Sequence, residues 1–234
     1  MKVSIVIPTY NRAHQLLKLL KSLDCLRKTL PEEVVVVDDC STDNTRSVVK
    51  SWAEEHHSFD VRYVKSNKNG GPAKARNLGI ENAVGEGIAF TDSDCVVHEL
   101  WVDALKKHLE KSPSLAGIGG KVQALKNDPI SRYYSYYHIL EPPASLCYLV
   151  TANCIYNREL IRNVGGFVET IGTPGGEDIG LSFKLYLKGH RFGYDENAIV
   201  YHDYRNSLMD FIRTFYHYGY GNRTISEMCN RDVL

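Results

Sequence analysis

The sequence has no excess of charge of either sign. Its 234 residues include 28 Lys and Arg and 28 Asp and Glu, so the formal net charge is zero. A neutral chain has no overall field that would attract nucleic acid or an anionic membrane, although a local basic site stays open. We therefore expect no nucleic-acid partner.

Long apolar runs are also missing. A membrane-spanning helix needs roughly 18 or more consecutive apolar residues, and no stretch approaches that length. The first apolar stretch soon meets Pro8, which argues against a secretory signal peptide. We expect a cytoplasmic protein without a membrane span.

The cysteines show no metal-binding or redox pattern. The six residues form no CxxC pair and no Cys/His spacing typical of zinc. Most lie inside apolar runs, where a free thiol behaves as a small apolar side chain. This usage indicates a reducing compartment, although one disulfide stays open.

What the sequence does contain is an alternation of buried strands and helices. Short continuous apolar runs predict strands at Val3–Pro8, Glu33–Asp39, Val61–Lys65 and Gly87–Asp92. Apolar residues at helical spacing predict helices between them, the second of which we expect Ser41 to cap. Strands joined by helical crossovers predict an α/β fold with a parallel, doubly wound sheet.

The second half of the chain has a different rhythm. It predicts a helix ending near Ser112, a glycine-rich strand at Ala116–Leu125, a strand at Ala198–Asp203 and an amphipathic helix from Ser207 to about Tyr220. No linker or repeat separates it from the first half, so we expect one packed unit.

Acidic residues follow the predicted strands. In an open parallel sheet, ligands bind at the carboxyl ends of the strands. Asp39 ends the second strand, and Asp92 and Asp94, separated by Ser93, follow the fourth. Adjacent carboxylates repel each other, and their hard oxygen atoms suit Mg²⁺ or Mn²⁺. The pair is either a solvated acidic turn or a site where a divalent cation meets phosphate oxygens.

The segment NGGPAKARN (Asn69–Asn77) is a candidate anion site. It places glycines, Lys74 and Arg76 at a predicted helix N-terminus, where backbone N–H groups and basic side chains bind anions such as a diphosphate. A solvated loop is an equal alternative. The sequence lacks GxGxxG and GxxxxGK[ST], which disfavours dinucleotide dehydrogenases and phosphate-loop nucleotidases.

Two further places could carry chemistry. Glu177 and Asp178 stand where a glycine-rich loop enters a helix, and they either cap that helix or include a general base. His202 ends the strand AIVYH and is either a capping or core histidine or a third metal ligand. By itself the structural role of His202 is favoured.

Taken in order, six motifs resemble glycosyltransferase family 2, which has the GT-A fold. They are VSIVIPTYNR, VVVVDDCSTDNT, NGGPAKARNLGI, AFTDSD, GGEDIGL and YHD. The resemblance implies a Rossmann-like, mostly parallel sheet with helices on both faces and a C-terminal acceptor-binding part. It divides a single domain, residues 1–234, into a nucleotide-binding half (1–95) and an acceptor and catalytic half (96–234).

The resemblance also implies a reaction. An inverting enzyme would move a sugar from a nucleotide-diphosphate sugar, with a UDP-sugar favoured, to an acceptor hydroxyl with the help of Mn²⁺ or Mg²⁺. The acceptor would be a saccharide, a lipid-linked molecule or another hydroxyl compound, and peripheral association with the inner face of a membrane is compatible. The segments Tyr133–Glu141 and Ser145–Asn153 show no acceptor signature.

The residue roles implied by the resemblance are specific. Asp178 would be the base, Glu177 would position the acceptor or the loop, and Asp94 and His202 would hold the metal. Tyr10 would lie against the nucleobase. The full set expected to bind the nucleotide sugar is Pro8, Tyr10, Arg12, Asp39 (rather than Asp38), Asn67, Gly71, Arg76 (toward the diphosphate), Asp92 and Ser93.

Two rival functions stay open. A nucleotidyltransferase that makes sugar nucleotides would need a glycine-rich phosphate loop after the first strand, and PTYNRAH lacks it. A non-catalytic module that binds nucleotide sugars would have no need of the base that Glu177 and Asp178 offer.

Overall fold

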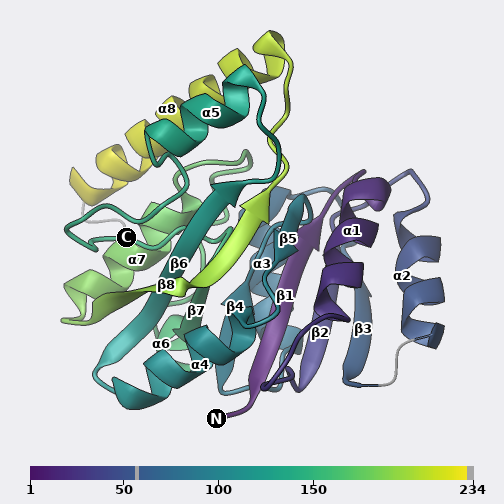
Figure 1. Cartoon of the computed structure of the whole chain (residues 1–234). Coiled ribbons are helices and arrows are strands. Elements are labelled where there is room, and N and C mark those ends of the chain that lie inside the picture. Colours follow the sequence, from purple (N-terminus) through teal and green to yellow (C-terminus); the bar gives the residue numbers. More distant parts are fainter. Residues whose placement is uncertain (56–57, 231–234) are drawn as a thin grey trace.

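The computed structural model describes residues 1–55 and 58–230 (Figure 1). Within these ranges eight strands form one sheet in the order β3-β2-β1-β4-β7-β6-β8-β5. The strands are β1 (Val3–Thr9), β2 (Glu33–Asp38), β3 (Asp60–Lys65), β4 (Gly87–Phe90), β5 (Cys95–Val97), β6 (Leu115–Ala124), β7 (Cys154–Asn157) and β8 (Arg191–His202). The helices are α1 (Ala13–Leu23), α2 (Thr45–Glu55), α3 (Gly71–Asn82), α4 (Trp101–Lys111), α5 (Pro129–Tyr136), α6 (Arg158–Asn163), α7 (Glu177–Leu187) and α8 (Leu208–Asn230).

The N-terminal part of the sheet is parallel. β1 pairs in parallel with β2 and β4, and β2 pairs in parallel with β3. β7 runs antiparallel to both β4 and β6, while β6 and β8 are parallel. β1 and β2 are continuous apolar runs because both of their faces are buried. The predicted α/β fold with a mostly parallel sheet is confirmed.

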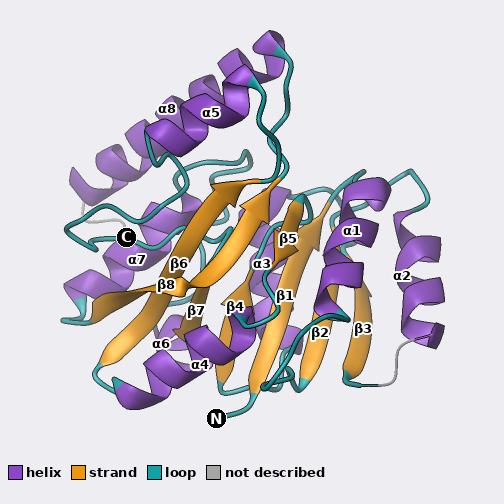
Figure 2. Ribbon diagram, in the orientation of Figure 1, coloured by secondary structure: helices purple, strands orange, loops and turns teal. Residues whose placement is uncertain are grey.

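Helices cover both faces of the sheet (Figure 2). On one face α1, α2 and α4 bury Leu16 and Trp101 among others, and on the other face α3, α6 and α7 bury Ile161. Successive residues of β1 enter different cores, Ile5 the first and Val6 the second, because side chains alternate along a strand. The carboxyl ends of β1, β2 and β4 are left to border a site.

The structure corrects several local expectations. Ser41 does not cap the second helix, because α2 begins at Thr45 and the Thr45 N–H donates to Asp43 Oδ1 at 3.0 Å. Ser41 Oγ instead accepts the N–H of Asn11 at 2.9 Å. The strand that ends in His202 begins at Arg191 rather than Ala198, and β5 is a strand that the apolar pattern does not predict.

The C-terminal helix lies apart from the sandwich of sheet and helices. α8 ends at Asn230 rather than near Tyr220, and it lies beside α5 above the carboxyl ends of β6 and β8 (Figure 1). Among the described helices none is both long enough and apolar enough to cross a membrane. All six cysteines are free thiols.

Candidate active site

A cavity of about 820 Å³ opens at the carboxyl ends of the strands. The predicted site residues that line it are Pro8, Tyr10, Arg12, Asp39, Gly71, Arg76, Asp92, Ser93, Asp94, Glu177, Asp178 and His202. Asn67 is not among the lining residues, since it is exposed on the loop after β3. Asn69 borders the cavity in its place, and its side-chain amide donates to the Asp39 carbonyl at 3.0 Å.

The Asp39 carboxylate binds the backbone N–H groups at the start of α3. It accepts the N–H of Gly70 at 2.9 Å and that of Gly71 at 2.8 Å, which are free donors at the helix N-terminus. Gly71 has a φ of +82°, and a Cβ there would come within 2.4 Å of the Gly172 carbonyl oxygen, so only glycine fits. The neighbouring Asp38 is buried, where it accepts hydrogen bonds from Ser41 N–H and the Tyr63 hydroxyl. Of the two aspartates, Asp39 is thus the one that lines the cavity.

Arg76 is a buried ion-pair centre. Its guanidinium donates to Asp92 Oδ1 at 2.8 Å and to Glu177 Oε1 at 2.9 Å, and the residue is 3% exposed. Burial alone would lower the pKa of Arg76, but Asp92, Glu177 and Asp178 outweigh burial and raise it. A buried charge is tolerated when it is paired in this way. Arg76 therefore joins the end of β4 to the start of α7.

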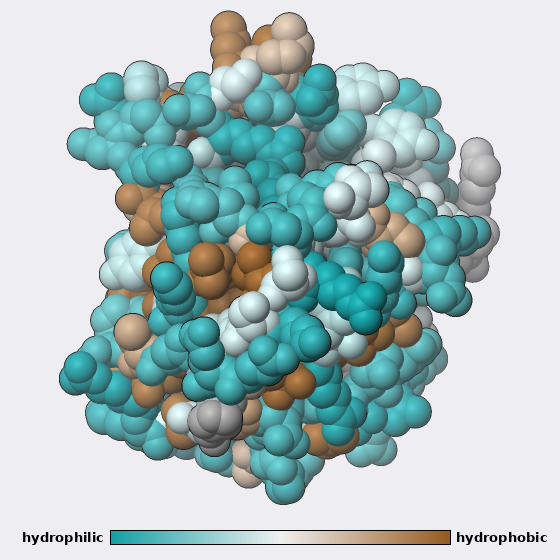
Figure 3. Space-filling view, turned by 90° about the vertical axis from the view of Figure 1, so that its right-hand side faces the viewer, coloured by the Kyte–Doolittle hydropathy of each residue, from teal (hydrophilic) through white to brown (hydrophobic). Residues whose placement is uncertain are grey.

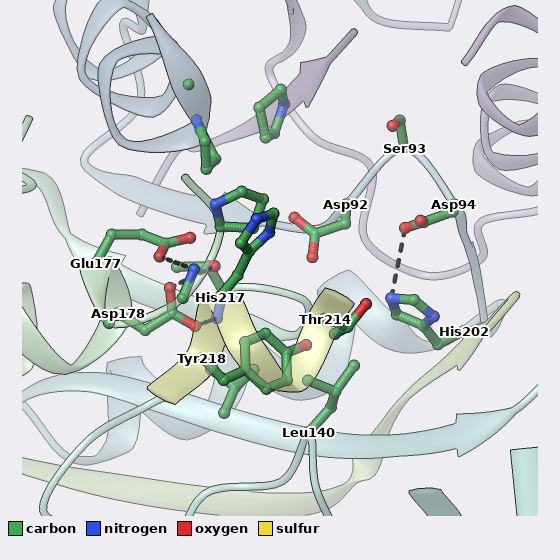
Figure 4. Close-up of a pocket in the computed structure, with 18 of the residues that line it drawn as sticks. Asp92, Ser93, Asp94, Leu140, Glu177, Asp178, His202, Thr214, His217 and Tyr218 are labelled. Atoms are coloured by element: carbon green, nitrogen blue, oxygen red, sulfur yellow. Dashed lines mark hydrogen bonds and ion pairs between the residues drawn. The ribbon is translucent and has the colours of Figure 1, made fainter. Parts of the chain in front are cut away.

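The Asp92 and Asp94 carboxylates have separate partners. Asp92 faces Arg76, whereas Asp94 Oδ1 lies 3.4 Å from His202 Nε2 (Figure 4). The two carboxylates therefore do not share one partner, since Asp92 lies beside Arg76 and Asp94 beside His202. The two carboxylates border different parts of the cavity.

Asp94 and His202 fit a divalent cation. The antiparallel pairing of β5 and β8 places Cys95 opposite His202, which brings Asp94 beside the imidazole. The ligand atoms of these three residues all lie within 4.8 Å of one another. Burial, with the nearby Asp94 and Asp92, raises the pKa of the Cys95 thiol well above its usual value. The available donors are therefore a carboxylate oxygen and an imidazole nitrogen, a set that suits Mn²⁺ and also allows Mg²⁺.

Glu177 and Asp178 begin α7 but face different partners. Glu177 is 4% exposed, and both of its carboxylate oxygens accept hydrogen bonds. Oε1 accepts from Arg76, and Oε2 accepts from the Gly175 N–H at 2.6 Å. Asp178 is half-buried and, among the described residues, accepts hydrogen bonds from Thr151 alone, through the backbone N–H at 3.1 Å and the hydroxyl at 3.0 Å. Burial and the neighbouring Glu177 raise the pKa of Asp178 to about 7, against the opposing effect of Arg76.

The structure adds residues that the sequence motifs do not indicate. Thr214, His217 and Tyr218 of α8 line the cavity, and Figure 4 shows Thr214 on the side of His202. Other residues that line the cavity and that no motif indicates are Tyr134, Tyr148, Val150, Thr151, Tyr204, Phe211, Phe215 and Asn222. The spacing of residues 211, 215, 218 and 222 is a legible signal of one helix face, but nothing in it says what that face covers.

Comparisons with known proteins show the family of this chain. The family model described as glycosyl transferase family 2 matches residues 4–165. The chain belongs to this family. The pre-mycofactocin glycosyltransferase of Mycobacterium tuberculosis is 32% identical over 93% of this chain, which corresponds to 46% of that protein. The chain thus spans about half the length of such a relative.

Solved structures agree on the fold of this family 2 chain. A mannosyltransferase from Pyrobaculum calidifontis, in complex with GDP-Man and Mn²⁺, has a TM-score of 0.72 and 25% identity, over 91% of this chain and 59% of its own. TarS of S. aureus, in complex with UDP-GlcNAc, has a TM-score of 0.71 and 25% identity, over 88% of this chain and 60% of its own. The GT-A fold expected from the sequence is confirmed.

Proposed function

We propose that this chain is an inverting glycosyltransferase that moves a sugar from a nucleotide-diphosphate sugar to an acceptor hydroxyl. The observation that carries the proposal is the contrast between Glu177 and Asp178. Glu177 is neutralised by Arg76, whereas Asp178 faces the cavity with a pKa raised to about 7. A general base works best when its pKa lies near the working pH.

The strand ends would hold the donor. Pro8 near the end of β1, Tyr10 and Arg12 after it, and Asp39 after β2 line the cavity, and the nucleoside would bind among them. A UDP-sugar is the first candidate, and the GDP-Man and UDP-GlcNAc complexes of the two neighbours support a nucleotide sugar in general. Because Arg76 is already paired twice, we assign it to holding Asp92 and Glu177 in place, so that a diphosphate would meet it only by displacing one carboxylate.

Direct displacement is the reaction that this arrangement supports. Asp178 would take the proton of the acceptor hydroxyl, whose oxygen then bonds to the anomeric carbon as the bond to the diphosphate breaks on the opposite side. Mn²⁺ or Mg²⁺, held by Asp94 and His202, would supply a positive charge that stabilises the leaving diphosphate. α8 and the glycine-rich loop before α7 would keep water from the reacting carbon.

Replacement of Asp178 by Asn tests this proposal. The variant keeps the shape and one accepting oxygen for Thr151 but cannot take a proton, so release of nucleoside diphosphate from UDP-GlcNAc, UDP-glucose or GDP-mannose should fall by about 10²–10⁴-fold. Binding of the free nucleoside diphosphate, measured calorimetrically, should stay near the wild-type value, because the residues proposed to bind the nucleoside do not include Asp178. Glu177→Gln is the matched neighbour and should lose less. If Glu177→Gln loses more than Asp178→Asn the roles are reversed, and if neither loses activity the mechanism is wrong.

The same assay separates the rival functions. A nucleotidyltransferase would form nucleoside triphosphate from the sugar nucleotide and pyrophosphate. A binding module would bind the sugar nucleotide without turnover. Only a glycosyltransferase releases the nucleoside diphosphate.

We further propose that the chain contacts the cytoplasmic face of a membrane through α8. Five apolar side chains, each at least 54% exposed, form an outer stripe on this helix: Leu208, Met209, Ile212, Tyr216 and Tyr220. In Figure 3 apolar side chains protrude at the top of the molecule, the end where α8 begins. Arg205, Arg213 and Arg223 are exposed on or near this helix, where each pairs with Asp210 or Glu227. Apolar and tyrosine side chains gathered on one exposed helix face are typical of helices that lie in a bilayer interface.

A further inference from the structure

His202 lacks the usual support of a metal-binding histidine. Such a histidine normally donates its second ring N–H to a carboxylate, a carbonyl or water, which fixes the tautomer and the ring orientation. Here Nε2 faces Asp94, and Nδ1 is buried with no hydrogen-bond partner among the described residues. Some other contact must hold the ring.

An aromatic stack supplies that contact. The Tyr204 ring lies 4.5 Å from the His202 ring at an interplanar angle of 20°, and the Tyr134 ring lies 4.2 Å from Tyr204 at 22°. Tyr204 and Tyr134 are 6% and 5% exposed, so neither ring is free to swing out. The three rings form a continuous column that ends at the Asp94 carboxylate.

The backbone explains why Tyr204 meets His202. The two residues are separated by one position at the end of β8, and side chains two apart on an extended chain point to the same side. Asp203 points the other way, where it pairs with Lys126 at 2.5 Å and Lys18 at 3.7 Å. These ion pairs anchor the segment from the opposite side and keep the two rings in register.

The column also reaches α8. Tyr134 contacts Phe211 at 6.1 Å and Phe215 at 5.9 Å between ring centroids, and both phenylalanines belong to the helix that covers the cavity. A shift of α8 would therefore change the position of the His202 ring, because the packed rings of Tyr134 and Tyr204 connect the two.

We infer that Tyr204 is a positioning residue for the metal site, and that its stacked ring, backed by Tyr134, orients His202 in place of a hydrogen bond to Nδ1. The inference rests on the proposed metal site formed by Asp94 and His202. It assigns a function to a tyrosine that no motif singles out. It also links the acceptor-side helices α5 and α8 to the donor-side cation.

Two substitutions at one position test the inference. Tyr204→Phe keeps the stack and should bind Mn²⁺, in the presence of UDP, as the wild type does. Tyr204→Leu stays apolar but removes the stack, and its Mn²⁺ affinity measured by electron paramagnetic resonance should fall roughly tenfold, the lower end of the effect of losing a support of a metal ligand. Asp94→Ala reports on the metal site itself.

The outcomes keep this inference and the proposed function apart. If the wild type and Asp94→Ala bind Mn²⁺ alike, the metal site is wrong. If Asp94→Ala loses Mn²⁺ but Tyr204→Leu binds as tightly as Tyr204→Phe, the metal site stands and the positioning role is overturned. A metal-free readout covers the case of altered folding: the His202 ring proton resonances, assigned with His202→Gln, should be shifted upfield by the stack in the wild type and Tyr204→Phe and should lose that shift in Tyr204→Leu. Unchanged resonances in Tyr204→Leu would also overturn the role.

Discussion

The two adjacent acids of α7 differ because of what surrounds each one. Glu177 is paired with the buried Arg76 guanidinium, and a buried charge is tolerated when it is paired in this way. Asp178 accepts from the neutral donors of Thr151, and burial together with the negative charge of Glu177 raises its pKa from the usual 3.8 to about 7. A difference of one position in the chain thus separates a structural carboxylate from one that can exchange protons near neutral pH.

The raised pKa predicts a pH dependence with a definite sign. Release of nucleoside diphosphate at low donor concentration should rise with pH up to about 7 and then level off, because Asp178 must be ionised to act as a base. Glu177→Gln removes a neighbouring negative charge and should move this step to lower pH. Thr151→Val removes a hydroxyl that stabilises the carboxylate and should move it to higher pH. A profile that is flat from pH 5 to pH 8, or shifts in the opposite directions, would contradict the assignment.

Stability should follow the same titration. Between about pH 4 and 7 the folded chain keeps a proton on Asp178 that the unfolded chain has lost, so this group makes the free energy of unfolding fall as pH rises through that window. Below about pH 4 Asp178 is protonated in both the folded and the unfolded chain, so this group no longer changes the free energy of unfolding with pH. The difference between the wild type and Asp178→Asn in urea unfolding isolates this contribution from the other carboxyl groups.

At the scale of elements, glycines let α8 pack directly on the loop that precedes α7. A Cβ at Gly221 would lie 1.8 Å from the Gly175 carbonyl oxygen, and one at Gly176 would lie 2.6 Å from the Gly221 carbonyl carbon. Gly175 and Gly176 have φ values of +115° and +88°, which other residues rarely adopt. The glycine-rich loop before α7 is therefore in backbone contact with α8, close to Glu177.

Gly221→Ala should loosen this contact. The added methyl group has no space, so α8 should shift away from the loop, with a lower melting temperature, earlier proteolysis within α8 and weaker sugar transfer. Gly219→Ala is the control for stability, because a Cβ there meets nothing within 4 Å and alanine in place of glycine within a helix stabilises it by about 1 kcal/mol. Equal melting temperatures for the two variants would show that the close contact does not hold α8.

At the scale of the whole molecule, one sheet runs through both halves of the chain. The strand order places β7, from the second half, directly beside β4 of the first. Arg76 adds an ion pair to Glu177, 101 residues away. The division into a nucleotide-binding half (1–95) and an acceptor half (96–234) stays a prediction about roles within this shared sheet.

The outer stripe of α8 gives a prediction for the molecule as a whole. A double substitution, Ile212→Ser with Tyr216→Ser, should reduce sedimentation with vesicles of phosphatidylcholine and phosphatidylglycerol. Loss of about 1–2 kcal/mol for each partly inserted side chain corresponds to at least roughly tenfold weaker partitioning. Leu187→Ser is the matched control, since Leu187 is 60% exposed but lies on α7 outside the outer stripe. Equal vesicle binding by the wild type and the double variant would rule out this surface.

The sequence by itself determined the parallel part of the sheet and predicted most of the strand-end residues that line the cavity. β1, β2 and β4 are buried on both faces, so each appears as a short apolar run whose end is marked by polar residues. The carboxyl ends of neighbouring parallel strands meet at one edge, and for this reason the order of residues alone is enough to expect Tyr10, Asp39 and Asp92 at one cavity.

Only the tertiary structure decided which residues meet across the cavity. The β5–β8 register brings Asp94 to His202, the pairing of Arg76 distinguishes Glu177 from Asp178, and the position of α8 adds Tyr218 to the lining of the cavity. Apolar spacing in a sequence records how deeply each local face is buried. It does not record which distant face completes the contact, because that choice depends on strand register and helix docking between segments far apart in the chain.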